Sequence, residues 1–146
     1  MTARERLRQA KRIVVKVGTS TLTHPSGGMN LHRIEHLVRE LIDIANQGKD
    51  ILLVTSGAIA AGMSALRLRE RPQSVPARQA LAAIGQGALL HIYEKFFHEY
   101  GRTMAQVLLT KENAARHHQY MNSRSALLEL LSMGVIPVIN ENDAVA

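Results

Sequence analysis

Short apolar runs alternate with longer amphipathic stretches along the 146-residue chain. Four runs contain few polar positions and end in turn-forming residues, which is typical of buried strands. They cover residues 12–17, 50–55, 103–110 and 135–139. Between them, apolar residues recur every three or four positions, which predicts helices. Strands without polar alternation that are joined through helices indicate a parallel sheet with helices on both faces.

The predicted helices have recognisable ends. Residues 4–11 form a short candidate helix, and Asn30 is a suitable N-cap for a helix that ends before Gly48. A long helix is expected over 77–100, with Pro76 just before its first turn. The apolar face of this long helix is expected to hold Leu81, Ile84, Ala88, Ile92 and Phe96.

Shorter segments complete the order of elements. Residues 23–28 and 69–76 are expected to be loops, and residues 56–62 a tight turn that opens a short helix. Asn122 is expected to cap a last helix, which Gly134 ends. The order is then β-α-β-α-α-β-α-β, and the fold class is α/β, a three-layer sandwich with a mainly parallel sheet.

Two glycines interrupt the long helix, at positions 85 and 87. Glycine costs about 1 kcal/mol relative to alanine at an interior helical position. We therefore expect both Gly85 and Gly87 to lie where another backbone or a ligand comes close.

Composition narrows the classes of protein that fit this pattern. The chain is 46% hydrophobic, enough for a core, and has no cysteine, which excludes disulfides and thiolate metal sites. No apolar run reaches the roughly 18 residues of a membrane helix, so no membrane contact is expected and the cytoplasm is the default location. His117 and His118 are interpreted as solvated side chains rather than metal ligands, since adjacent residues on a helix point apart.

The formal net charge of +6 is unevenly distributed. Residues 1–12 contain five basic side chains and one acidic one, which leaves thirteen basic and eleven acidic side chains for the rest of the chain. We therefore separate a basic N-terminal arm, residues 1–11, from a domain over residues 12–146. Only 3% of the residues are aromatic. A stacking groove for bases needs more, so nucleic acid is not expected as a partner.

Polar residues and glycines gather where three of the predicted strands end. They are Lys16, Gly18 and Thr19 at the first strand, Ser56 and Gly57 after the second, and Asn140, Glu141, Asn142 and Asp143 after the fourth. The carboxyl ends of parallel strands lie at the edge of the sheet where ligands bind. These residues therefore form the candidate functional site.

Each of these residues has a functional and a structural interpretation. Lys16 either carries an ammonium group to an anion or protects an exposed sheet edge. Gly18 and Gly57 either turn backbone N–H groups toward an anion or form ordinary turns. Both glycines follow the end of a predicted strand, and this equivalence favours the anion-binding interpretation. Ser56 is favoured as a hydrogen-bonding ligand over a nucleophile, because no glycine stands two residues before or after it.

The polar residues after the fourth strand suit an amino acid. A carboxylate such as Asp143 binds an ammonium group, and amides such as those of Asn140 and Asn142 bind a carboxylate. The alternative is a turn that uses these side chains for its own backbone. Four such side chains in a row exceed what a turn requires.

Four sequence segments stand out together. They are Val-Val-Lys-Val-Gly-Thr-Ser at 14–20, Val-Thr-Ser-Gly-Ala-Ile-Ala-Ala-Gly at 54–62, Ala-Ala-Ile-Gly-Gln at 82–86 and Val-Ile-Asn-Glu-Asn-Asp-Ala-Val-Ala at 138–146. In this order they resemble the glutamate 5-kinase branch of the amino acid kinase superfamily, over nearly the whole chain. The first is shared across the superfamily, whereas the second and fourth are specific to the branch. The alternatives are another amino acid kinase, such as an acetylglutamate kinase or aspartokinase, and a non-catalytic module that binds glutamate or proline.

The resemblance implies ATP-dependent phosphorylation of the γ-carboxylate of L-glutamate to glutamyl 5-phosphate, the first step of proline biosynthesis. It also implies Mg²⁺, feedback inhibition by proline and a homo-oligomer. Lys16 would contact the transferring phosphate as the catalytic residue, with Gly18 and Thr19 at the phosphates. The implied substrate-binding residues are Ser56, Gly57, Asn140 and Asp143.

The resemblance covers the N-terminal, amino-acid-binding part of the family's domain. The nucleotide-binding part is expected outside these 146 residues. We therefore expect the isolated chain to be inactive.

Overall fold

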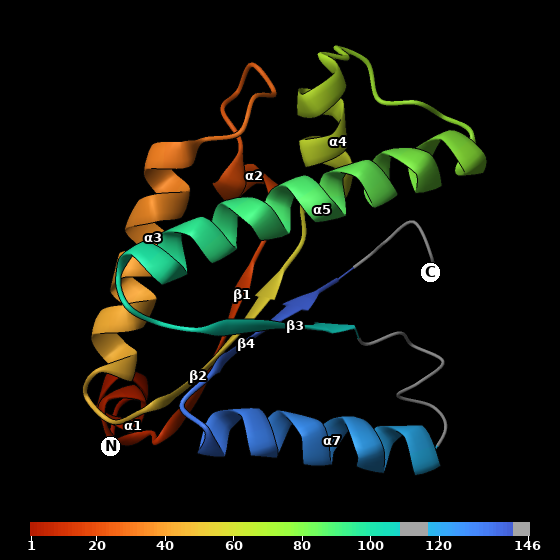
Figure 1. Cartoon of the computed structure of the whole chain (residues 1–146). Helices are drawn as coiled ribbons and strands as arrows, with labels where there is room; N and C mark the ends of the chain where they lie inside the picture. The colour runs from red at the N-terminus through yellow and green to blue at the C-terminus, as the bar shows by residue number, and fades with distance from the viewer. Residues whose placement is uncertain (109–116, 142–146) are drawn as a thin grey trace.

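Four strands form one parallel sheet in the order β1-β2-β4-β3 (Figure 1). The computed structural model describes the backbone of residues 1–108 and 117–141, and the side chains of residues 1–108 and 123–141. The strands are β1 (Arg12–Val17), β2 (Asp50–Thr55), β3 (Met104–Leu108) and β4 (Ile136–Asn140). All three neighbouring pairs are parallel, as predicted.

Helices cover both faces of this sheet, and the direction of the connections explains which helix lies where. The helices are α1 (Ala3–Gln9), α2 (Thr19–Leu22), α3 (Leu31–Ala45), α4 (Ala58–Leu66), α5 (Val75–Glu99) and α7 (His117–Ser132). The steps from β1 to β2 and from β2 to β3 run one way along the sheet, and the step from β3 to β4 runs back. Right-handed crossovers therefore put α3 and α5 on one face and α7 on the other, as Figure 1 shows. The predicted three-layer α/β class is confirmed.

The main core lies between the sheet and the helices α3 and α5. Its members include Tyr93 and Phe97 of α5, Ile34 and Val38 of α3, and Ile51, Leu53 and Val138 of the sheet. All of these side chains are essentially inaccessible to solvent. Burying one aliphatic or aromatic side chain of this size contributes about 1.5–3 kcal/mol, so this layer holds α3 and α5 against the sheet. None of the helices in the described ranges is long and apolar enough to cross a membrane.

The expectation of a fully buried first strand is wrong. Burial alternates along β1, with Val17 buried and Val14 61% exposed. β1 lies at the edge of the sheet and pairs with β2, while α7 packs against β4 on the outer face. Alternate side chains of a strand point to opposite faces, so Lys16 shares the open face with Val14 and reaches solvent.

The described element boundaries lie within about two residues of the predicted ones except at two places, and the predicted end of the third strand lies outside the described residues. Asn30 caps α3 as expected, since its Oδ1 accepts a hydrogen bond from the N–H of Arg33 at 3.1 Å. Asn122 lies within α7 rather than before its first turn, because α7 begins five residues earlier at His117. Residues 117–122 include no glycine or proline that would stop a helix. The one-turn helix α2 was not predicted, since its hydroxyl residues favour turns; the buried side chain of Leu22 anchors it.

The buried face of α5 is rotated by about one residue from the predicted one. Leu81 is buried, but Ile84 is 42% exposed. The buried residues are Leu81, Ala82, Gly85, Leu89, Tyr93 and Phe97. A Cβ atom at Gly85 would overlap the carbonyl oxygen of Ala58 in α4, whereas one at Gly87 would meet nothing within 4 Å. The expectation that another backbone comes close is therefore confirmed for Gly85 and is wrong for Gly87.

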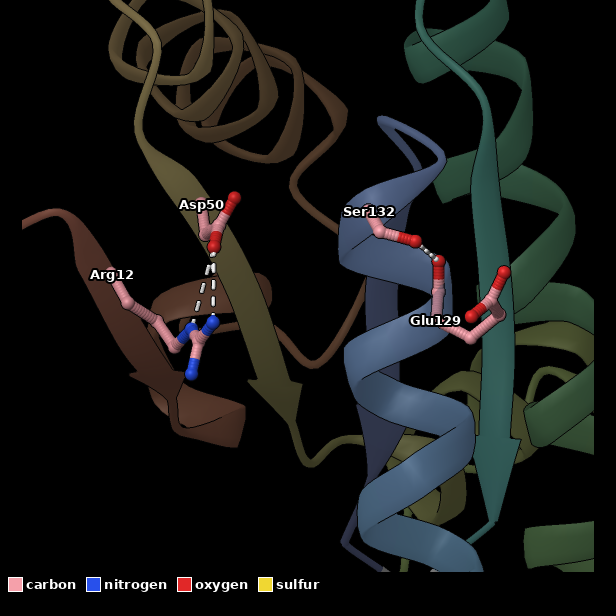
Figure 2. Close-up of polar contacts among 4 residues, drawn as sticks. All are labelled: Arg12, Asp50, Glu129 and Ser132. Atoms are coloured by element: carbon pink, nitrogen blue, oxygen red, sulfur yellow. Dashed lines mark hydrogen bonds and ion pairs between the residues drawn. The ribbon is translucent and has the colours of Figure 1, made fainter.

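An ion pair joins the amino ends of β1 and β2, at the end of the sheet opposite the candidate site (Figure 2). The Nη2 and Nε atoms of Arg12 lie 3.2 and 3.4 Å from Oδ2 of Asp50, its partner in the strand register. Figure 2 also shows the hydroxyl of Ser132 donating to the carbonyl oxygen of Glu129 at 2.7 Å, at the end of α7. Both contacts are exposed and each contributes at most about 1 kcal/mol.

Candidate functional site

The register of the sheet brings three strand ends to one edge. Val17 of β1 is paired with Thr55 of β2, and Thr55 is paired with Asn140 of β4. The segments that leave these three strands therefore start side by side, as parallel pairing predicts. The backbone N–H of Glu141 donates to the carbonyl oxygen of Thr55 at 2.8 Å, which continues the contact one residue beyond β4.

Lys16 forms an ion pair across this edge. Its Nζ lies 3.2 Å from Oε2 of Glu141, and the two side chains are 67% and 44% exposed. An ion pair this open to solvent contributes little to stability, so an incoming anion can replace the carboxylate at low cost. Both interpretations of Lys16 agree with its position, because it lies on an edge strand and beside the other site residues. Glu141 was noted in the sequence but was given no role there.

Ser56 is held by the end of β1. Its N–H and its Oγ both donate to the carbonyl oxygen of Val17, at 3.1 and 3.2 Å. A hydroxyl carries one proton, so Thr19 must be the donor in the 3.2 Å contact between its Oγ1 and the Oγ of Ser56. The two predicted residues Thr19 and Ser56 are therefore in direct contact. Both hydroxyls already donate to a neighbouring oxygen. A ligand can therefore accept a hydrogen bond from one of them only by replacing its present acceptor.

The two glycines of the site differ in their backbone. Gly57 has a φ of +104° and precedes the first residue of α4, so its left-handed conformation favours glycine. A Cβ there would also lie 3.2 Å from Cδ1 of Leu22. Gly18 has a φ of −85°, and a Cβ there would meet no atom within 4 Å. Backbone conformation therefore explains the glycine at position 57 only.

A pocket of about 80 Å³ lies at the Ser56–Gly57 turn. It is lined by Thr19, Ser56, Gly57, Ala58, Ile59, Ala60, Met63, Arg71 and Glu141. Of the predicted site residues, Lys16, Gly18 and Asn140 are not in its wall, and Asp143 lies outside the described residues. Arg71 was missed, because it comes from the loop between α4 and α5 rather than from a strand end.

Asn140 has an inward position beneath α5. It is 4% exposed and shares the inner face with Ile136 and Val138. Its Oδ1 accepts no hydrogen bond from the described part of the chain. A buried acceptor without a partner costs about 1–3 kcal/mol. The structure thus brings Asn140 to the predicted edge of the sheet, but the residue is buried and does not line the pocket.

Known proteins that are similar in sequence to this chain point to one family. The sequence profile described as the Amino acid kinase family matches residues 11–146. The chain is 56% identical over 149 residues to a protein named glutamate 5-kinase from Moorella thermoacetica, covering all of this chain and 39% of the relative. It is 58% identical over 135 residues to a glutamate 5-kinase of Caldanaerobacter subterraneus subsp. tengcongensis, covering 92% of this chain and 36% of the relative. A glutamate 5-kinase of Clostridium acetobutylicum is 50% identical over 145 residues, covering 99% of this chain and 54% of the relative.

The chain thus spans between about a third and a half of the length of the curated relatives that it matches. The profile match covers nearly the whole chain, and the parallel sheet with its polar carboxyl edge is the architecture that the four sequence segments imply. On these grounds the chain belongs to the amino acid kinase family.

Proposed function

We propose that this chain is the glutamate-binding part of a cytoplasmic glutamate 5-kinase. The whole protein would use ATP to phosphorylate the γ-carboxylate of L-glutamate, which gives glutamyl 5-phosphate and begins proline biosynthesis. The pocket at the Ser56–Gly57 turn carries this proposal, together with Glu141, which lines the pocket and forms an ion pair with Lys16. The names of the relatives support the choice of substrate.

The proposed reaction needs positioning and charge neutralisation more than covalent chemistry. A γ-carboxylate oxygen of glutamate attacks the γ-phosphorus of ATP, the bond to the bridging oxygen breaks, and ADP leaves. Lys16 is the described residue suited to neutralise charge on the transferring group, with Gly18 and Thr19 beside the phosphates. Its contact with Glu141 is exposed, so Lys16 can exchange this carboxylate for a phosphate oxygen.

The pocket has donors that suit the two carboxylates of glutamate. The hydroxyl of Ser56 is a donor, and Arg71 offers a guanidinium group, which binds carboxylates through two parallel hydrogen bonds. Gly57 adds a backbone N–H at the start of α4. Asn140 and Asp143 remain proposed partners of glutamate on the grounds of the sequence alone.

Mg²⁺ fits this part of the protein as a companion of ATP rather than as a resident ion. Within the described side chains, those of residues 1–108 and 123–141, no group of three or more His, Cys, Asp or Glu could hold a metal ion. Glu141 is the carboxylate in the pocket wall, and it is already paired with Lys16. Since Mg²⁺ is commonly bound through substrate phosphates and one or two carboxylates, we write the nucleotide substrate as Mg-ATP.

An assay of ADP release by the whole protein tests the proposal. We expect release that depends on L-glutamate in the presence of Mg-ATP, and none with aspartate or N-acetylglutamate at the same concentration. Equal or faster release with either of those would indicate a different amino acid kinase. Binding of glutamate without any release would indicate a non-catalytic module. Adding proline to the same assay tests feedback inhibition, and light scattering tests the proposed homo-oligomer.

A further inference from the structure

A chain of hydrogen bonds connects the core to the Ser56–Gly57 turn. The hydroxyl of Tyr93 in α5 lies 2.8 Å from Oγ1 of Thr55, and Thr55 donates to the carbonyl oxygen of Ser56 at 2.9 Å. Thr55 has one hydroxyl proton, which it uses on Ser56, so Tyr93 is the donor in the first contact. Burial raises the pKa of Tyr93 to about 12, which keeps its proton in place at neutral pH.

Neither member of this chain is accessible to solvent. Tyr93 and Thr55 are both 0% exposed, so no water can replace a lost partner without disturbing the core. Buried polar networks in which each hydroxyl has a partner fix a single arrangement of their groups. The carbonyl of Ser56 is therefore held by a contact that begins two elements away, on α5.

The same helix supports the turn at a second point. Gly85 of α5 lies so close to α4 that a side chain there would overlap the carbonyl oxygen of Ala58. Ser56 and Ala58 stand on either side of Gly57, whose φ of +104° sets the direction in which α4 leaves the strand. One rigid helix thus contacts both sides of the residue at which the chain turns.

We propose that Tyr93, acting through Thr55, is a positioning residue that holds the Ser56–Gly57 turn in the conformation that lines the pocket. The role of this pocket in glutamate binding rests on the proposed function. Neither Tyr93 nor Thr55 lines the pocket. Lys16 on β1, the group proposed for the phosphate, takes no part in this hydrogen-bond chain. Loss of the chain should therefore weaken glutamate binding and leave ATP binding unchanged.

Four variants of the whole protein test this inference by steady-state kinetics. Tyr93→Phe removes the first donor, Thr55→Val removes the link, and Thr55→Ser keeps the hydroxyl. Tyr100→Phe is the matched control, because Tyr100 caps the far end of α5 and its hydroxyl donates to Glu35 at 2.6 Å, away from the turn.

We expect Tyr93→Phe and Thr55→Val to raise the KM for glutamate about three- to tenfold, the effect of one lost hydrogen bond. The KM for ATP should change less than twofold in both variants. Thr55→Ser and Tyr100→Phe should resemble the unchanged protein. The inference is wrong if glutamate KM stays constant in both test variants, if both KM values rise together, or if Tyr100→Phe gives the same rise.

Amide hydrogen exchange of residues 55–60 supplies a readout that does not depend on activity. Exchange there should be faster in Tyr93→Phe and Thr55→Val than in Tyr100→Phe, and unchanged exchange would overturn the inference even if the protein is active. If the unchanged protein releases no ADP with glutamate, the proposed function fails while the exchange result still decides the positioning role. Should Tyr93→Phe not fold, the comparison of Thr55→Val with Thr55→Ser decides it.

Discussion

The ammonium group of Lys16 faces a carboxylate before any substrate arrives. Glu141 therefore occupies the position in which a phosphate oxygen is proposed to bind, and it balances the charge of the Lys16 ammonium group. Because both side chains are largely exposed, the pair is a weak contact that rearranges readily. The role of a residue at this edge therefore depends on which group replaces its present partner, and Lys16 is the clearest case.

Lys16→Ala in the whole protein should lower kcat far more than it raises the KM for glutamate. The lost charge is needed most where negative charge develops on the transferring phosphate, and removal of one such donor costs about 3 kcal/mol, or roughly a hundredfold in rate. Steady-state kinetics with both substrates measures the effect. A kcat equal to that of the unchanged protein would exclude Lys16 from catalysis.

Tyr93 should also make the protein sensitive to alkaline pH. Its pKa is about 12 in the folded protein, against 10.0 for the free side chain, because burial disfavours the charged form. A group whose pKa is raised by folding stabilises the fold fully below its unfolded pKa. That stability is lost as pH rises from about 10 to 12, by roughly 2–3 kcal/mol.

Urea unfolding at several pH values compares the unchanged protein with Tyr93→Phe. Above pH 10 the free energy of unfolding should fall more steeply in the unchanged protein than in the variant. Curves that stay parallel up to pH 12 would show that the Tyr93 hydroxyl titrates normally.

Among the elements, α5 has the largest influence on the site, since it packs on α4 and reaches Thr55. Gly85→Ala should lower the free energy of unfolding by about 1–3 kcal/mol or more, because the added methyl group overlaps the backbone of α4. Gly87→Ala is the matched control, two residues away on the same helix with open space around it. It should raise stability by up to about 1 kcal/mol, and destabilisation by both variants would contradict this account of α5.

The two glycines also show how far sequence alone predicts this fold. The periodicity of apolar residues predicted the bounds of β1 and β2 and the position of α5 within two residues. It could not distinguish Gly85 from Gly87, because only the position of α4 separates them. The exposed side of β1 was missed for the same reason, since an apolar run looks alike whether or not a helix covers it.

In the candidate site, too, some residues could be predicted from the sequence and others could not. Lys16, Ser56 and Gly57 were predictable because parallel topology alone brings strand ends together. Arg71 and Tyr93 were not, since one comes from a loop and the other lies within a long apolar helix, where an aromatic residue indicates only core. A contact made across the fold leaves no local pattern.

For the molecule as a whole, the described sheet has two open edges, formed by β1 and β3. Val14 on β1 and Leu108 on β3 are 61% and 59% exposed. Open edges with apolar side chains favour association between chains. A preparation of residues 1–146 alone should therefore self-associate, and it should release no ADP with glutamate and Mg-ATP.

Light scattering of this preparation measures the association, and Val14→Lys should reduce the apparent mass by placing a charge on the open face. Met133→Lys is the control, since Met133 is 66% exposed but lies beyond the end of α7, outside the sheet. A monodisperse monomer with glutamate-dependent turnover would contradict the prediction.

The inner position of β4 has a consequence for synthesis of the protein. β4 is the last of the four strands to leave the ribosome, yet its place is between β2 and β3. At synthesis rates of about 5–20 residues per second, on the order of ten seconds pass between completion of β2 and completion of β4. During that time β1 and β2 can pair, but the other edge of β2 lacks its neighbour. The nascent chain is therefore most in need of chaperone protection before residues 136–140 emerge, and a ribosome paused in α7 prolongs that need.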